Sequence, residues 1–269
     1  MLEPIGEVWL TGNDCRFAGG PFAGEKLGDA WHRMSDDWSG RNVSRDKPFP
    51  LLVKFIFPEE KLSVQVHPED DYARKNGAPS GGVGKTEMWY IISAREGAEV
   101  RVGPKPGVDR DRFRRAIADG SAEEYVERLA VHAGDAIFVP AGTVHTIGPG
   151  MTICEIQQNS DITYRVFDFN RLTREGKPRD LHIEKAMEVI RFGKRHGGKA
   201  TAVKFDERRN AVSTLIDCPQ FAVVKSVFSE PEYRARPADL MEIVIVIEGA
   251  GKIEVRDAKM EYARAQAWL

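Results

Sequence analysis

The chain has 269 residues, of which 42% are hydrophobic and 30% are charged, and its formal net charge at pH 7 is −2. This composition is typical of a soluble globular protein, and the balanced charges argue against a nucleic-acid-binding surface. No stretch approaches the roughly 18 apolar residues that a membrane-spanning helix needs. The three cysteines are far apart and the first residues carry no signal-peptide pattern, so we expect a cytoplasmic protein without disulfides.

The N-terminal part predicts strands separated by loops. The segment 6–40 is rich in Gly, Trp and Asp, and it predicts an opening strand, turns and a short helix over 27–34. Apart from Lys54, residues 51–57 are apolar, β-branched or aromatic, and a proline follows them, which predicts a buried strand. A second strand is expected over 63–67. The Glu, Asp, Asn, Pro and Gly residues of 68–84 then predict a surface loop.

The middle of the chain predicts strands with a helical insertion between them. The strands are expected over 87–93, 98–102 and 134–140. Residues 109–129 instead have helical spacing of their apolar side chains, which predicts two short helices. Ser121 would cap the second helix, and Glu124, three residues later, would complete a capping box.

The C-terminal part begins with an amphipathic helix, expected over 181–192 and ended by a Gly-Gly linker. Strand signals then return over 211–216, 221–228 and the strongly apolar 241–247. This region predicts a second, smaller β domain.

Two histidines and a glutamate on these strands are candidate metal ligands. In a strand, residues two apart point the same way, so Gln65 and His67 share a face, as do Lys85 and Glu87. His145 follows a Pro-Ala-Gly turn. His67, Glu87 and His145, facing one interior, form a ligand set suited to zinc or a related divalent ion. The alternative for Glu87 is an ion pair with Lys85, which would also offset the cost of burying its carboxylate.

Five sequence motifs occur along the chain. They are TGNDCRFAGGPFAG at 11–24, SVQVHP at 63–68, KTEMWYI at 85–91, VPAGTVH at 139–145 and EIQQNSDITYRVFDFNR at 155–171. Together they resemble the short bacterial form of type I mannose-6-phosphate isomerase, a zinc enzyme of the cupin fold. The resemblance implies a mainly β protein. Its expected parts are a catalytic cupin (jelly-roll barrel) domain over 1–178 with a helical insertion at about 106–130, a helical linker over 179–198 and a cupin-like β domain over 199–269.

The resemblance also implies a reaction and its cofactor. The reaction is the reversible isomerisation of mannose 6-phosphate to fructose 6-phosphate through a cis-enediol(ate), with one zinc ion per chain. Gln65 would be a fourth ligand beside the two histidines and the glutamate. A small sugar phosphate is therefore the expected partner, with no nucleic acid and no membrane.

Other residues take their expected roles from the same resemblance. Arg165 matches the family's active-site arginine and would stabilise the enediolate; the alternative is a strand-end ion pair with Asp168. Ser63 and Lys85 match positions linked to substrate and phosphate binding. The proton-transferring base stays open between Glu155, Lys85 and a metal-bound water.

Two other classes of cupin are the alternatives to an isomerase. One is a non-catalytic sugar-binding or sugar-sensing module, and the other is a metal-dependent oxygenase, because a fold does not fix a function. The complete set of candidate ligands together with Arg165 favours catalysis. The TYR…FDFNR segment, and Lys85 beside Glu87, disfavour an oxygenase.

The last residues predict an unusual C-terminal domain. Residues 262–269 occupy the place where the family runs into a strand and a Pro-Ala turn, and they end on Trp268-Leu269. We expect an incomplete second barrel, with a strand edge and apolar surface that need cover. Self-association through this domain would supply that cover.

Overall fold

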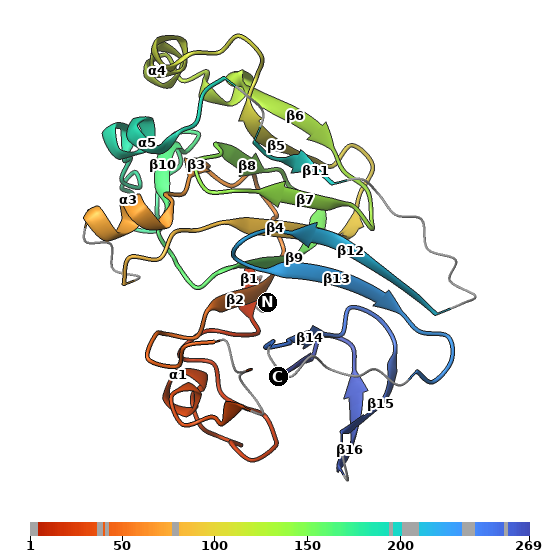
Figure 1. Cartoon of the computed structure of the whole chain (residues 1–269). Coiled ribbons are helices and arrows are strands. Elements are labelled where there is room, and N and C mark those ends of the chain that lie inside the picture. Colours follow the sequence, from red (N-terminus) through yellow and green to blue (C-terminus); the bar gives the residue numbers. More distant parts are fainter. Residues whose placement is uncertain are drawn as a thin grey trace. The chain divides into compact units, whose positions relative to one another are not determined.

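The computed structural model describes residues 5–36, 40, 43–76, 81–193, 196–200, 210–232, 240–255 and 258–269 (Figure 1). Its contacts divide the chain into two compact units. They are Met1–Val8 with Phe55–Glu232, and Trp9–Lys54 with Tyr233–Leu269. This division differs from the predicted domain bounds, which stay a prediction. No helix in the described part of the chain has the length and apolar character to cross a bilayer.

The first unit contains most of the regular structure. Its strands are β3 (Val64–Val66), β4 (Glu87–Ala94), β5 (Glu99–Pro104), β6 (Val126–Ala130), β7 (Ala136–Val139), β8 (His145–Ile147), β9 (Met151–Gln158), β10 (Tyr164–Phe167), β11 (Gly198–Lys199), β12 (Ala211–Asp217) and β13 (Ala222–Val227). Its helices are α3 (Asp70–Lys75), α4 (Arg110–Ala118) and α5 (Ile183–Val189), with a 3₁₀ turn, η1 (Ala122–Tyr125). The predicted loop over 68–84 thus includes the short helix α3.

Two antiparallel sheets of this unit form the barrel. One contains the order β9-β4-β7-β11 and the other has the order β10-β3-β8-β5-β6. Apolar side chains from both sheets meet in one cluster, with Trp89 and Ile137 from the first sheet and Val100 and Ile147 from the second. The predicted mainly β jelly roll is therefore confirmed.

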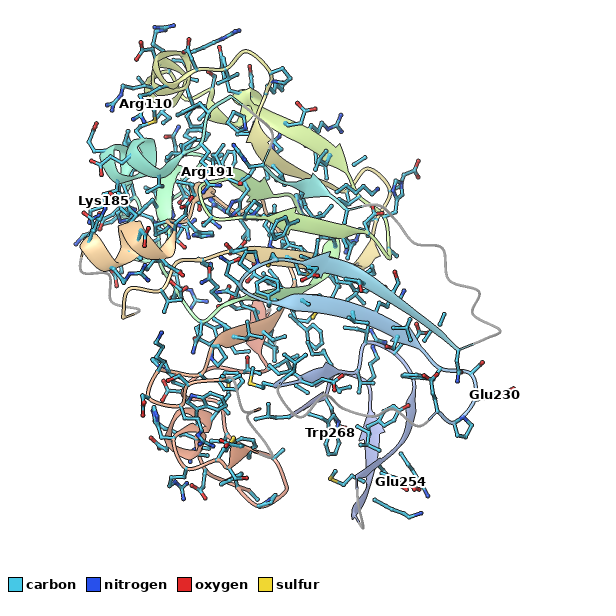
Figure 2. The ribbon with its side chains drawn as sticks, viewed as in Figure 1. Arg110, Lys185, Arg191, Glu230, Glu254 and Trp268 are labelled. Carbon is cyan, nitrogen blue, oxygen red and sulfur yellow. The ribbon has the colours of Figure 1, made fainter. Side chains whose placement is uncertain are left out.

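The second sheet buries its other face under helices. Val64 and Val66 of β3 pack in a cluster with Phe113 of α4 and Met187 of α5. Because side chains alternate along a strand, Gln65 between these two valines points into the barrel. Figure 2 shows Arg110 on α4 and Lys185 on α5, the helices of this cluster.

The predicted helical insertion is only partly correct. α4 forms where expected, and the Asp109 carboxylate caps it by accepting a hydrogen bond from the Arg112 amide at 2.8 Å. The second helix is wrong, because β6 pairs with β5 there and only η1 remains helical. The capping box is wrong too, since the Ser121 hydroxyl donates to the Asp119 carboxylate instead.

The second unit contains α1 (Leu27–Trp31), β14 (Val244–Ile245), β15 (Ala250–Val255), β16 (Ala258–Ala263) and β17 (Ala267–Trp268). The chain passes between the two units within β1 (Glu7–Trp9) and β2 (Leu51–Ile56). The buried Trp31 packs edge-on against Phe49, and Met241, Ile243 and Leu269 pack against the same cluster. Segments from the two ends of the chain therefore share one small core.

The strands near the C-terminus form two-stranded ribbons. β12 pairs with β13, β14 with β17, and β15 with β16. The strand expected over 241–247 is limited to β14, in which Val244 pairs with Trp268 of β17. Trp268, labelled in Figure 2, is half-buried. Residues 201–209, 233–239 and 256–257 lie outside the described residues, so the incomplete second barrel stays a prediction.

Candidate metal centre and active site

Three donor side chains converge at the polar end of the barrel interior. Glu87 begins β4, His145 begins β8 and His67 directly follows β3; each is at most 1% exposed. Their donor atoms all lie within 4.8 Å of one another. His67 Nε2 lies 3.1 Å from Glu87 Oε1, and His145 Nε2 lies 3.9 Å from Glu87 Oε2. This group can hold a metal ion.

Backbone carbonyls fix the orientation of both histidine rings. His67 Nδ1 lies 2.7 Å from the carbonyl oxygen of Ile162, and His145 Nδ1 lies 2.9 Å from that of Thr143. A carbonyl only accepts, so the proton of each neutral ring sits on Nδ1 and a lone pair sits on Nε2. Burial lowers the pKa of His67 to about 3 and also lowers the pKa of His145, so both rings are neutral at pH 7.

The resulting donor set suits a cation. His67 Nε2 has no hydrogen-bond partner among the described residues, and it faces the Glu87 carboxylate, which is also an acceptor. Two imidazole nitrogens and a carboxylate oxygen, all with lone pairs directed at one another, are the ligand types that zinc prefers. The chemistry of the donors therefore fits the ion that the sequence predicts.

Glu87 makes an ion pair as well. Lys85 Nζ lies 3.0 Å from Glu87 Oε1, and the Lys85 side chain is 5% exposed. Burial by itself would raise the pKa of Glu87, but Lys85 and then His67 hold it well below its usual value. Glu87 is thus a carboxylate at neutral pH. The ion pair with Lys85, predicted as the alternative for Glu87, therefore forms in the structure. It does not prevent Glu87 from belonging to the donor group.

Gln65 lies beside this group. It pairs with His145 across β3 and β8, and its Nε2 lies 3.4 Å from His145 Nε2. Its Oε1 accepts a hydrogen bond from the Ser63 hydroxyl at 3.2 Å. Turning the carboxamide by 180° exchanges its oxygen and nitrogen, which would present an oxygen donor to the group.

Arg165 reaches the same end of the barrel from β10. It pairs with Gln65 in the register of β10 and β3, so both side chains point into the interior. Its Nε donates to the Ser63 hydroxyl at 3.3 Å and its Nη1 to the Asp180 carbonyl at 3.1 Å. Arg165 forms no ion pair within the described residues. Asp168 instead binds Arg171 at 2.5 Å and Arg179 at 2.7 Å, so the predicted alternative for Arg165 is wrong.

Comparisons with individual known proteins, rather than with family models, identify the family. No model of a known protein family matches the chain. The mannose-6-phosphate isomerase of Streptococcus mutans is 39% identical over 212 residues, covering 79% of this chain and 65% of that protein. The probable mannose-6-phosphate isomerase GmuF of Bacillus subtilis is 40% identical over 228 residues, covering 83% of this chain and 70% of that protein. This chain belongs to the mannose-6-phosphate isomerase family.

Solved structures agree with this assignment. The crystal structure of mannose 6-phosphate isomerase from Bacillus subtilis matches with a TM-score of 0.84 and 31% identity, over 97% of this chain and 82% of that chain. A zinc-bound mannose 6-phosphate isomerase matches with a TM-score of 0.70 and 14% identity, over 98% and 86%. The second likeness shows the shared fold alone. The chain spans about two thirds of the length of the Streptococcus mutans relative, 65%.

Within this mannose-6-phosphate isomerase fold, Trp89 joins two of the candidate carboxylates. Its indole N–H donates to Glu155 Oε1 at 3.0 Å and contacts Glu87 Oε2 at 3.2 Å. The fully buried indole pairs with Glu155 across β4 and β9. Sequence reasoning did not single out Trp89, although its position two residues after Glu87 already places it on the same face.

Gln157 is a second residue that the sequence did not single out. It lies opposite Glu87 in the pairing of β9 with β4, so the two side chains share a face. Its amide donates to the Ser160 carbonyl at 2.6 Å and to the Gln158 carbonyl at 3.0 Å. Its Oε1 is buried and has no hydrogen-bond partner within the described part of the chain. An acceptor is therefore available next to Glu87.

Proposed function

We propose that this chain interconverts mannose 6-phosphate and fructose 6-phosphate. The observation that carries the proposal is the convergence of two neutral histidines and a carboxylate beside an arginine that has no carboxylate partner among the described residues. Aldose–ketose isomerisation moves a proton between C1 and C2 and develops negative charge on oxygen. Such a reaction needs fixed positive charge at that oxygen. The named activity of the relatives supports the same conclusion.

His67, Glu87 and His145 would hold one zinc ion, with Gln65 as the fourth ligand. When bound, the ion supplies Lewis-acid stabilisation of developing oxygen charge. The carbonyls of Ile162 and Thr143 would keep both histidine rings in the tautomer that this role requires.

Arg165 would act directly on the substrate. A guanidinium stays charged at neutral pH and offers its donors in a planar fork. Ser63 and the Asp180 carbonyl hold that fork in place beside Gln65. In this position it would bind the enediolate oxygens as their charge develops. Ser63, whose hydroxyl lies between Arg165 and Gln65, would contact the substrate as well.

Glu155 and Lys85 are the side chains proposed for proton transfer. Glu155 offers a carboxylate that the Trp89 indole orients, and Lys85 offers an ammonium that the Glu87 carboxylate orients. A metal-bound water remains the third choice. Lys85 was also predicted to contact substrate. Its 5% exposure means that such a contact would occur inside the barrel.

The cellular setting is part of the same proposal. The free cysteines Cys15, Cys154 and Cys218 support a reducing compartment, so we place the protein in the cytoplasm with a small sugar phosphate as its partner.

The proposal is tested with the wild-type protein in a coupled isomerase assay. We expect turnover of mannose 6-phosphate, with little or none of glucose 6-phosphate or unphosphorylated mannose. Chelation should lower turnover by at least about 100-fold, because several kcal/mol of charge stabilisation corresponds to two or more factors of ten. Added zinc should restore it. Metal-loaded protein that binds sugar phosphate without turnover would favour the non-catalytic cupin instead.

A further inference from the structure

Residues 84–86 lie directly before β4 and include Lys85. The backbone amides of all three residues donate hydrogen bonds. Gly84 N donates to Asp70 Oδ1 at 2.7 Å, Lys85 N to the Pro68 carbonyl at 3.0 Å, and Thr86 N to Gln158 Oε1 at 2.9 Å. Two of these three acceptors are side chains, which lie 88 residues apart in the sequence.

Asp70 and Gln158 also bind each other. Gln158 Nε2 donates to Asp70 Oδ1 at 3.0 Å, the same oxygen that receives the Gly84 amide. The backbone amide of Gln158 donates to the Thr86 carbonyl at 3.1 Å. The amides on both sides of Lys85 are therefore tied to one side-chain pair, which we call the Asp70–Gln158 clamp.

Close packing leaves this segment little freedom. A Cβ atom on Gly84 would lie 2.7 Å from the Pro68 carbonyl oxygen, the Glu69 carbonyl carbon and the Asp70 nitrogen. Only a glycine fits without displacing the segment that follows His67. The backbones beside His67 and Lys85 are thus packed directly against each other.

The position of Lys85 matters because its ammonium lies inside the donor group. It contacts Glu87 Oε1 at 3.0 Å, while His67 Nε2 lies 3.1 Å from the same oxygen. A lysine side chain has several rotatable bonds, so its backbone must be fixed if the ammonium is to keep that place. None of the roles proposed above involves Asp70 or Gln158.

We propose that Asp70 and Gln158 are positioning residues that hold Lys85 against Glu87 in the active site. They act through the backbone of residues 84–86 and do not touch substrate. The kinetic part of this inference rests on the proposed isomerase function. The backbone part does not, and it is measured separately.

The kinetic test compares Asp70→Ala with Asp71→Ala. Asp71 is the neighbouring carboxylate of α3, 81% exposed and paired with Arg74, so its loss should leave kcat unchanged. Asp70→Ala should lower kcat about 10- to 100-fold with a small change in KM, because displacements of about 1 Å in a catalytic group have effects of this size. Asp70→Asn keeps an acceptor oxygen and should recover most of the activity.

Gln158→Met and the double variant test whether the two residues act as one unit. Gln158→Met removes the carboxamide with little change in volume and should lower kcat in the same range. The kcat of the double variant Asp70→Ala/Gln158→Met should be no lower than that of the less active single variant, since the effects of interacting residues are not additive. Fully additive losses would contradict the clamp.

Hydrogen exchange of the peptide that contains residues 84–86 gives a result that needs no activity. Asp70→Ala and Gln158→Met should each speed exchange there, and Asp71→Ala should not. Unchanged exchange, or a lowered melting temperature with normal kcat, would overturn the inference. If the wild type showed no isomerase activity but the exchange pattern held, the proposed function would fail while the clamp stood.

Discussion

Replacing Arg165 with alanine is expected to lower kcat about 100- to 1,000-fold, the range seen when one donor to a developing oxyanion is removed. The fold and metal content should stay intact, because Arg165 forms no ion pair in the described part of the chain and its partners are a hydroxyl and a carbonyl. For the purified variant, steady-state kinetics measure kcat, metal analysis measures the zinc content, and thermal unfolding measures the stability of the fold.

Two further variants sharpen this result. Arg165→Lys keeps the charge but cannot span Ser63 and the Asp180 carbonyl with a planar fork, so we expect it to recover only part of the activity. Arg114→Ala removes an exposed arginine that pairs with Glu184 and should behave as wild type. Loss of solubility or metal in Arg165→Ala, with normal kcat in the remaining folded protein, would make Arg165 a structural residue.

Replacing Glu87 with alanine should remove the metal and weaken the fold together. Without Glu87 the donor group loses its only carboxylate, and Lys85 keeps a buried charge with no ion-pair partner among the described residues. Removing one member of a buried ion pair costs about 3–5 kcal/mol of unfolding free energy. Urea unfolding and elemental analysis of the variant should show both losses, with isomerase activity below detection.

A double variant separates the two effects. Glu87→Ala/Lys85→Met removes both charges, and such replacement is often neutral for stability, so the free energy of unfolding should return toward the wild-type value. Metal binding should not return. A Glu87→Ala protein that kept one zinc ion per chain would show that another residue supplies the carboxylate.

The grouping of the candidate ligands could be predicted in part from the sequence because strands have a short, regular period, whereas the expected roles of Gln65, Ser63 and Arg165 came from the family resemblance. Once β3 and β4 were placed, alternation alone put Gln65 with His67 and Lys85 with Glu87. The prediction needed no exact strand bounds. It could not include the Ile162 carbonyl that orients His67, because a contact across 95 residues leaves no local pattern.

The errors lie where distant partners decide the structure. Residues 126–130 have apolar spacing compatible with a helix, yet pairing with β5 makes them a strand. The apolar run 241–247 looks like one strand, but Met241 and Ile243 pack on the α1 cluster and only Val244 and Ile245 form a strand. Sequence proximity suggested that Asp168 pairs with Arg165, but Asp168 lies beyond the end of β10 and binds Arg171 and Arg179.

The deep burial of His67, Glu87 and His145 has a consequence for the rate of metal exchange. At no more than 1% exposure, the three side chains are out of reach of a chelator and of a sugar phosphate alike while the barrel stays closed. Release of the ion would therefore wait for a local opening of the barrel, a process with its own free energy and rate. Extraction should reach a limiting rate that no longer rises with chelator concentration, and that rate would report how often the barrel opens.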